Sequence, residues 1–238
     1  MYSLFLVESV PTSGNFTLSG DEAHHAIKVL RISIGELLHL SDGAGNWASG
    51  VVAAIEKKSL EIEIKNSGFE PQEKLHVVVI QAIPKGDRVR EAIELLTEAG
   101  VDEIIPWQAA RSIGKSEKGS DKWRTAAREA TKQSRRFWIP EVTDVSTTTQ
   151  IASLISHAPS IVFHESATVK ISEIAHGIEA TSGKVYLIIG PEGGITDEEL
   201  HTFKESGAKI AHLGRPVLRS AHAGIAGIAA FKAARGIW

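Results

Sequence analysis

The stretch from Val185 to Thr196, with the sequence VYLIIGPEGGIT, constrains the fold of this chain more than any other. Its first five residues are apolar, which indicates a strand buried on both faces of a sheet. Three glycines follow within residues 190–194, and Thr196 with Glu199 three positions later is a capping box that predicts a helix start. A buried strand, a glycine loop and a helix start favour an α/β sheet, where ligands bind beyond the carboxyl ends of the strands.

Two interpretations of the glycine loop are open at this point, a ligand cradle and a simple turn. Glycine permits positive φ and close approach of a ligand to the backbone, and a helix start offers free N–H groups. Many strand-to-helix turns carry glycine for turning alone. The loop does not fit G-x-G-x-x-G, and the chain has no G-x-x-x-x-G-K-[ST], which argues against dinucleotide and P-loop nucleotide sites.

Composition excludes several classes of protein. The 238 residues are 42% apolar and 23% charged, as in an ordinary globular protein, and the absence of cysteine excludes disulfides and thiolate catalysis. No apolar run reaches membrane-spanning length, and the N-terminus, MYSLFLVESV, lacks a signal-peptide pattern. His164-Glu165 begins like a zincin motif, but Thr168 stands where its second histidine must be. We expect a cytoplasmic enzyme without a membrane segment or a metal.

The first 70 residues have the pattern of a small β-barrel. Strand-like runs are followed by turn signals at Asp42-Gly43 and Asn66-Ser67-Gly68. Ser19 with Glu22 predicts a capped short helix, and residues 69–73 are typical of a linker. The predicted strands are residues 2–7, 36–40, 47–55 and 60–64.

Beyond the linker, strands alternate with helices, which predicts a largely parallel sheet with helices on both faces. We therefore expect two domains, a barrel over 1–70 and an α/β domain over 71–238. The predicted strands are residues 75–83, 101–107, 160–164, 185–189 and 209–213. The predicted helices are residues 87–99, 121–136, 147–155, 170–178, 197–206 and 221–234.

Two more strand ends share the design of the glycine loop. The predicted strand 209–213 leads into Gly214-Arg215-Pro216-Val217-Leu218-Arg219-Ser220, where Ser220 can cap the last helix. The predicted strand 160–164 ends beside Glu165. Together, these three late strand ends could surround one ligand.

Positive charge gathers in one segment. Residues 111–140 hold nine basic and three acidic residues, a surplus of six that leaves −9 for the remainder, given the net charge of −3. Arg124, Arg128 and Lys132 recur every four residues and predict one stripe on a helix, with Trp123 and Trp138 nearby. Such a stripe suits RNA phosphates and stacked bases, or it is a solvated helix face.

The three loops together resemble one family. LIIGPEGGITDEEL followed by LGRPVLRSAHAG resembles the C-terminal signature of the SPOUT methyltransferases, most closely the RsmE family, which methylates N3 of a uridine in 16S ribosomal RNA with S-adenosylmethionine. HHAIKVLRISIGELLHLSDG resembles that family's PUA-like RNA-binding barrel. KGDRVREAIELLTEAGVDEIIPW and REATKQSRRFWIPEV resemble its middle motifs, so the resemblance runs the whole length.

The resemblance implies a C-terminal trefoil knot, which general topology rules disfavour, and a homodimer with its active site at the subunit interface. It also implies a small-ribosomal-subunit RNA partner and a bound S-adenosylmethionine. The implied cofactor-binding residues are His164, Glu165, Ile189, Gly190, Pro191, Gly193, Gly194, Leu213, Gly214, Val217 and Leu218. The expected RNA-binding residues are Arg31, Arg124, Arg128, Lys132, Arg135 and Arg136.

Two residues are candidates for catalysis. Glu192 could accept the N3 proton, and Arg219 could stabilise charge on the uracil oxygens or bind a phosphate. The sequence departs from the family motif downstream, where Pro216 occupies the first arginine position and Ala221-His222 replace a Glu-Thr pair. The alternatives are a SPOUT enzyme with another RNA target and a non-catalytic RNA-binding assembly factor.

Overall fold

The computed structural model describes residues 2–86, 88–114, 120–178 and 181–238. The chain forms two compact units, one of residues 1–72 with 131–139 and one of residues 73–130 with 140–238. This division differs from the expected one in two respects, because the boundary lies after residue 72 and residues 131–139 cluster with the N-terminal unit. Asp87 at the start of a predicted helix and Lys115, Glu117 and Lys118 of the basic segment lie outside the described residues.

The first unit is a five-stranded sheet in the order β1-β3-β4-β5-β2, in which β1 and β3 are parallel and the other neighbours antiparallel. One face of this curled sheet encloses a core that includes Phe5, Leu38 and Leu40. The strands are β1 (Ser3–Leu6), β2 (Asn15–Leu18), β3 (Leu37–Ser41), β4 (Asn46–Ile55) and β5 (Leu60–Phe69). The sequence pattern did not predict β2.

Two local predictions in this unit are wrong. The turn signal at Asn66-Ser67-Gly68 lies inside β5, because β4 pairs with that strand out to Phe69 through two register shifts. Ser19 precedes α1 (Gly20–His24), but its side chain makes no cap hydrogen bond. The helix continues as a π-helix, η1 (His25–Leu30), which ends at Arg31 in the left-handed conformation at φ 53°.

The segment 131–139 is tied to the barrel by backbone bonds. The Gly45 N–H donates to the Phe137 carbonyl at 2.9 Å, and the Ile139 N–H donates to the Gly43 carbonyl at 2.9 Å. A Cβ on Gly43 would lie 2.4 Å from Ile139 Cδ1, so glycine is required for this approach. The indole of Trp138 adds a bond to the Glu70 carbonyl at 2.8 Å.

The second unit is built on a six-stranded sheet in the order β11-β9-β10-β6-β7-β8, with parallel pairing throughout. Its strands are β6 (Leu75–Ala82), β7 (Glu103–Trp107), β8 (Glu141–Val142), β9 (Ser160–Phe163), β10 (Gly183–Ile189) and β11 (Lys209–Ala211). Its helices are α2 (Arg88–Glu98), α3 (Asp121–Ser134), α4 (Thr148–Ile155), α5 (Ile171–His176), α6 (Asp197–Glu205) and α7 (Ser220–Ala234). The last residues of α3 belong to the first unit.

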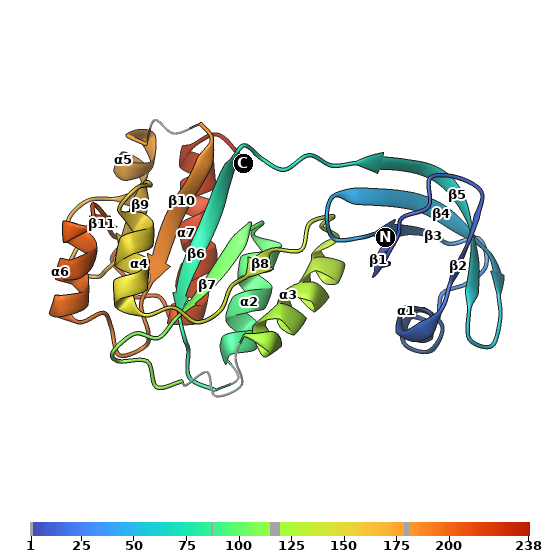
Figure 1. The fold of residues 1–238 in the computed structure, drawn as a ribbon, viewed down its shortest axis with the longest axis horizontal. Helices are drawn as coiled ribbons and strands as arrows, with labels where there is room; N and C mark the ends of the chain where they lie inside the picture. The colour runs from blue at the N-terminus through green and yellow to red at the C-terminus, as the bar shows by residue number, and fades with distance from the viewer. Residues whose placement is uncertain (1, 87, 115–119, 179–180) are drawn as a thin grey trace. The chain divides into compact units, whose positions relative to one another are not determined.

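Helices cover both faces of this sheet, as the alternating pattern predicts (Figure 1). Helices α2, α5 and α7 share one core with the odd-numbered side chains of β6, and α4 and α6 share another with the even-numbered ones. Trp123, considered above for stacking on RNA, is 4% exposed and belongs to the first of these cores. Among the described helices, none has the length and apolar character needed to cross a membrane.

Candidate functional site

Three loops of the second unit meet around one cavity of about 350 Å³. They follow β9, β10 and β11, which are adjacent and parallel, so their carboxyl ends lie at the same edge of the sheet. The structure therefore brings the three sequence-predicted loops together. The lining residues are Phe163, His164, Glu165, Ile189, Gly190, Pro191, Glu192, Gly194, Ile195, His212, Leu213, Gly214, Arg215, Pro216, Val217, Leu218, Arg219, Ser220 and Ala223.

The loop after β10 presents bare backbone to the cavity. A Cβ on Gly190 would lie 2.7 Å from Ile195 Cγ1, and Gly194 has a φ of 75° that a side chain rarely tolerates. The loop ends in the predicted capping box, in which Thr196 Oγ1 accepts from the Glu199 N–H and the Glu199 carboxylate accepts from the Thr196 N–H. The local sequence thus specifies both the turn and the start of α6.

Gly193 differs from its neighbours because it does not line the cavity. A Cβ there would lie 3.0 Å from Arg111 Cβ, and Arg111 Nη1 donates to the Gly193 carbonyl at 3.1 Å. Its glycine therefore permits the close packing of the loop that carries Arg111. The expected backbone contact of Gly193 with a cofactor stays a prediction.

Ser220 connects two of the loops, and the sequence did not predict this. The N-cap of α7 is Arg219, without a side-chain cap bond, so the expectation that Ser220 caps the helix is wrong. The Ser220 hydroxyl instead donates to the Gly190 carbonyl at 2.7 Å and accepts from Gln81 Nε2 at 3.0 Å. Gln81 and Ser220 are 0% and 6% exposed, so both side chains of this relay are buried.

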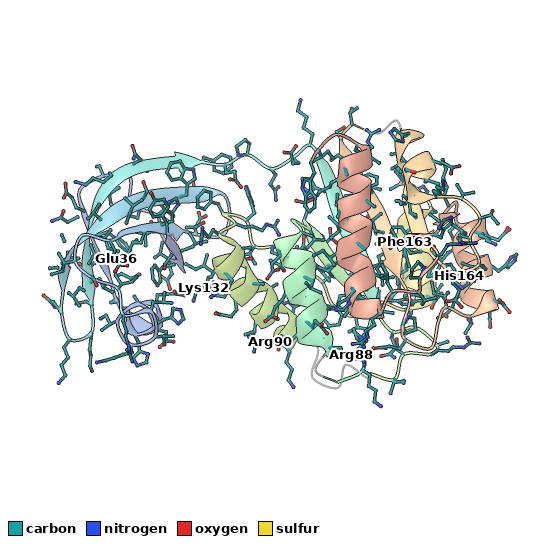
Figure 2. All side chains as sticks on the ribbon, turned by 180° about the vertical axis from the view of Figure 1, so that it is seen from behind. Glu36, Arg88, Arg90, Lys132, Phe163 and His164 are labelled. Carbon is teal, nitrogen blue, oxygen red and sulfur yellow. The ribbon has the colours of Figure 1, made fainter. Side chains whose placement is uncertain are left out.

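Glu192 lines the cavity, but the groups that bond its carboxylate do not line it. Its Oε1 accepts from the Lys85 N–H and from Arg88 Nη1, both at 3.4 Å. Both donors lie just after β6, at the carboxyl edge of the sheet, and Figure 2 labels Arg88 together with Phe163 and His164 of the β9 end. The carboxylate is therefore oriented by a neighbouring loop.

The loop after β11 contributes both cationic and exposed apolar side chains to the wall of the cavity. Arg215 and Arg219 are exposed, as are Val217 and Leu218, with 76% and 40% of their surfaces accessible. His212, which the sequence did not single out, accepts through Nδ1 from the Gly214 N–H at 3.1 Å and shapes the turn. Large apolar side chains that stay exposed beside a cavity indicate a ligand surface.

Other lining residues could not be selected from the sequence. Phe163 and Ile195 lie in apolar stretches, and Ala223 is one of the many small residues of α7, so their types fit an ordinary core. The His164 ring bonds to the Ser166 hydroxyl at 2.7 Å, a local turn contact. Across the described ranges, no three His, Asp or Glu side chains are grouped to hold a metal ion.

Arg124, Arg128 and Lys132 lie on α3 as expected, but the basic residues expected to bind RNA are divided between the two units. Arg124 and Arg128 belong to the second unit, whereas Arg31, Lys132, Arg135 and Arg136 belong to the first. Arg124 donates to Asp144 at 2.7 Å and to Asp121 at 3.0 Å. α3 ends at Ser134 and Arg135 is left-handed at φ 57°, so the row stops there.

Lys132 is the clearest departure from the expected stripe. It is 8% exposed, and its ammonium donates to Glu22 at 3.0 Å (Lys132 is labelled in Figure 2). Glu22, expected to complete the box with Ser19, serves this ion pair within the first unit instead. A buried, paired lysine ties segment 131–139 to the barrel, and its expected contact with an RNA phosphate stays a prediction.

Comparison with known proteins agrees with this architecture. Residues 71–232, more than half of the chain, match the model of an RNA methyltransferase domain, and residues 18–65 match that of an RNA methyltransferase PUA domain. Ribosomal RNA small subunit methyltransferase E of Mycobacterium tuberculosis is 38% identical over 92% of this chain and 87% of the relative. The enzyme of that name from Bacillus subtilis is 29% identical over 90% and 87%.

Solved structures give the same result for the whole fold. The ribosomal RNA small subunit methyltransferase E of Neisseria gonorrhoeae bound to S-adenosyl methionine superposes with a TM-score of 0.83 at 26% identity, covering 98% of both chains. A methyltransferase from Legionella pneumophila in complex with the same cofactor has a TM-score of 0.80 at 28% identity, covering 98% and 97%. The chain belongs to the RNA methyltransferase family, with a PUA domain before its methyltransferase domain.

Proposed function

We propose that this protein uses S-adenosylmethionine to methylate N3 of a uridine in the 16S RNA of the small ribosomal subunit. The observation that carries the proposal is the cavity that the three loops after β9, β10 and β11 enclose. The names of the relatives support ribosomal RNA as the substrate, and the cofactor in the two solved structures supports S-adenosylmethionine. The N3 position comes from the resemblance of the loop motifs to the RsmE family.

The residues around the cavity fit the proposed cofactor. Its volume of about 350 Å³ lies in the range of small-molecule sites, and most such sites are apolar with a few placed polar groups. Phe163, Ile189 and Leu218 offer apolar surface to an adenine or a methionine chain. Gly190 and Gly194 offer backbone without a Cβ, and they would hold the polar edges of the cofactor.

When bound, S-adenosylmethionine supplies a methyl group already activated by its sulfonium. The protein then has to align uracil N3 with that methyl and to remove the N3 proton, which is the work of positioned side chains. Negative charge grows on the two uracil oxygens as the proton leaves. A donor that binds those oxygens more strongly at that stage accelerates the reaction.

Arg219 has the position and chemistry for that donor. It is exposed at the cavity, at the N-cap of α7, and its side chain serves no cap. A guanidinium and a sulfonium repel at short range, so Arg219 should face the RNA and not the cofactor. Its planar fork matches uracil oxygens or a phosphate in a two-point contact that lysine does not reproduce.

Glu192 is the proposed acceptor of the N3 proton. It lines the same cavity, and its contacts with Arg88 and the Lys85 N–H limit the directions its carboxylate can take. Glu192→Gln keeps the shape and removes the proton acceptor, so methyl transfer should fall strongly while cofactor binding persists. If Glu192→Gln transfers the methyl group as fast as the wild type, Glu192 is not the acceptor of the N3 proton.

The homodimer and the trefoil knot are also part of this proposal, and both rest on the resemblance. A dimer would complete the active site with residues of a second copy. Light scattering at micromolar concentration should give twice the chain mass of 25.6 kDa. A monomer mass would contradict that expectation.

Titration calorimetry with S-adenosylmethionine separates the enzyme from a non-catalytic RNA-binding assembly factor. The enzyme should bind the cofactor with a measurable heat, and Gly194→Val should abolish that heat while the protein stays folded. No heat up to millimolar cofactor would favour the assembly factor. Ser206→Ala, a substitution away from the cavity, is the matched control.

A further inference from the structure

Four aromatic rings stack on one face of the N-terminal unit. Tyr2 and His39 have centroids 5.6 Å apart with an interplanar angle of 21°, and His39 and Phe137 are 5.8 Å apart at 11°. Trp47 lies 5.6 Å from Phe137 at 14° and 6.4 Å from His39 at 24°. The rings are close to parallel, an arrangement that continues readily to a further flat ring.

This stack lies on the outer face of the barrel sheet. Leu38, Leu40 and Ala48 point into the core, so their neighbours His39 on β3 and Trp47 on β4 point outward by strand alternation. Phe137 arrives from segment 131–139, and its backbone carbonyl accepts from the Gly45 N–H. The three inner rings therefore help to fix that segment to the barrel, which accounts for their packing.

Tyr2 is not needed for that attachment. It extends the stack by one ring at its outer end, and 50% of its surface stays exposed. Within the described residues, His39 is its one aromatic partner, so one ring contact holds a side chain that is otherwise half exposed. An exposed aromatic ring at the end of a stack is the surface on which proteins bind single-stranded nucleic acid.

The charge around the stack suits the same ligand. Burial, with a smaller contribution from Arg135, lowers the pKa of His39 below its ordinary value of 6.5, so this ring is neutral at pH 7. Arg135 is exposed and is held at φ 57° in the left-handed region, which directs the chain sharply at the end of α3. Arg135 lies two residues before Phe137 of the stack, so a neutral ring stack and an exposed cation come from one segment, which matches a base and its phosphate.

We propose that the exposed face of Tyr2 is a stacking site for one unpaired base of the RNA, with Arg135 binding a neighbouring phosphate. The site belongs to the N-terminal unit alone. It rests on the proposed function only in taking RNA as the ligand. Stacking does not depend on the identity of the base, so the site would bind the RNA strand without selecting the target nucleotide.

The test compares the affinity of the full chain for a fluorescent decamer of uridines and for the same decamer with abasic riboses, by anisotropy. Tyr2→Leu should weaken binding to the uridine decamer about fivefold or more, as expected for one lost base–aromatic contact. It should leave binding to the abasic decamer unchanged. Tyr2→Phe keeps the ring and should bind like the wild type.

Two further variants sharpen the comparison. Phe69→Leu removes another exposed ring of the same unit, 57% exposed and outside the stack, and should change neither affinity. Arg135→Asn, which tolerates the left-handed conformation, should reduce the slope of log affinity against log salt by about 0.7, the value for one phosphate on a single strand. Tyr2→Leu should leave that slope unchanged because it removes no charge.

The proposal is overturned if Tyr2→Leu binds the uridine decamer like the wild type, or if it weakens both decamers equally. It is also overturned if Tyr2→Phe loses as much affinity as Tyr2→Leu, since the hydroxyl would then be the contact. Methyl transfer to small ribosomal subunits by the wild type is measured separately. Its absence would contradict the proposed function, while the decamers would still decide the stacking site.

Discussion

Ser220→Ala tests how the cavity is built. The substitution removes a hydroxyl that donates to the Gly190 carbonyl at 2.7 Å and accepts from Gln81 Nε2 at 3.0 Å. It does not remove a helix cap, because the N-cap of α7 is Arg219. The change therefore isolates the connection between the loop after β10 and the start of α7.

The magnitude follows from burial. A buried polar group left without its partner costs about 1–3 kcal/mol. Gln81 Nε2 keeps its bond to the Ala82 carbonyl at 3.0 Å, and Gly190 is only partly buried, so water can replace part of the loss. We expect about 1–2 kcal/mol, which is a factor of roughly 5–30 in an equilibrium constant.

The loss should be seen in two assays. Ser220 and Gly190 both line the cavity, so titration calorimetry should show S-adenosylmethionine affinity reduced by about 5- to 30-fold. Thermal unfolding without ligand should show a lower midpoint. Ser206→Ala is the control, because the Ser206 hydroxyl only donates to the Thr202 carbonyl at the end of α6, and it should leave cofactor affinity unchanged. Wild-type affinity in Ser220→Ala would refute the view that this relay shapes the cofactor site.

Substitutions at three more positions test other parts of the account. Gly194→Ala should lower cofactor affinity in the same titration and Gly194→Val should lower it further, because a β-branched side chain is strained at φ 75°; wild-type affinity in both would contradict this. Arg219→Ala and Arg219→Lys should lose most methyl transfer while cofactor affinity stays within a few-fold, and a parallel loss of both would place Arg219 in the cofactor site. Lys132→Met should lower the free energy of unfolding by about 3 kcal/mol or more, measured with urea, because it removes the cation of a buried ion pair. If the variant keeps the wild-type stability but the slope of log RNA affinity against log salt becomes smaller, Lys132 binds an RNA phosphate instead.

The parts of the fold set by local sequence were predictable. The apolar run before the glycine loop became β10, and Thr196 with Glu199 became the capping box of α6. Parallel pairing followed from the alternation of strands and helices. These features depend on residues close together in the chain, so a pattern within a short window carries the information.

The predictions that were wrong concern features that depend on residues far apart in the chain. Glu22 matches a capping box locally, yet Lys132, 110 residues away, takes its carboxylate. Ser220 precedes a helix and looks like a cap, but the end of β10 brings the Gly190 carbonyl to its hydroxyl. Trp123 lies among cations in sequence and in the core in space. The Tyr2 stack likewise joins residues from four separate segments, which no spacing rule connects.

The most direct test of the central claim is the identity of the methylated nucleoside. The protein is incubated with methyl-labelled S-adenosylmethionine and small ribosomal subunits from cells that lack this chain, and the 16S RNA is digested and analysed by mass spectrometry. We predict one labelled nucleoside, N3-methyluridine, absent from the reaction with Arg219→Ala. Label in a different nucleoside, or no label although the cofactor binds, would contradict the proposed reaction.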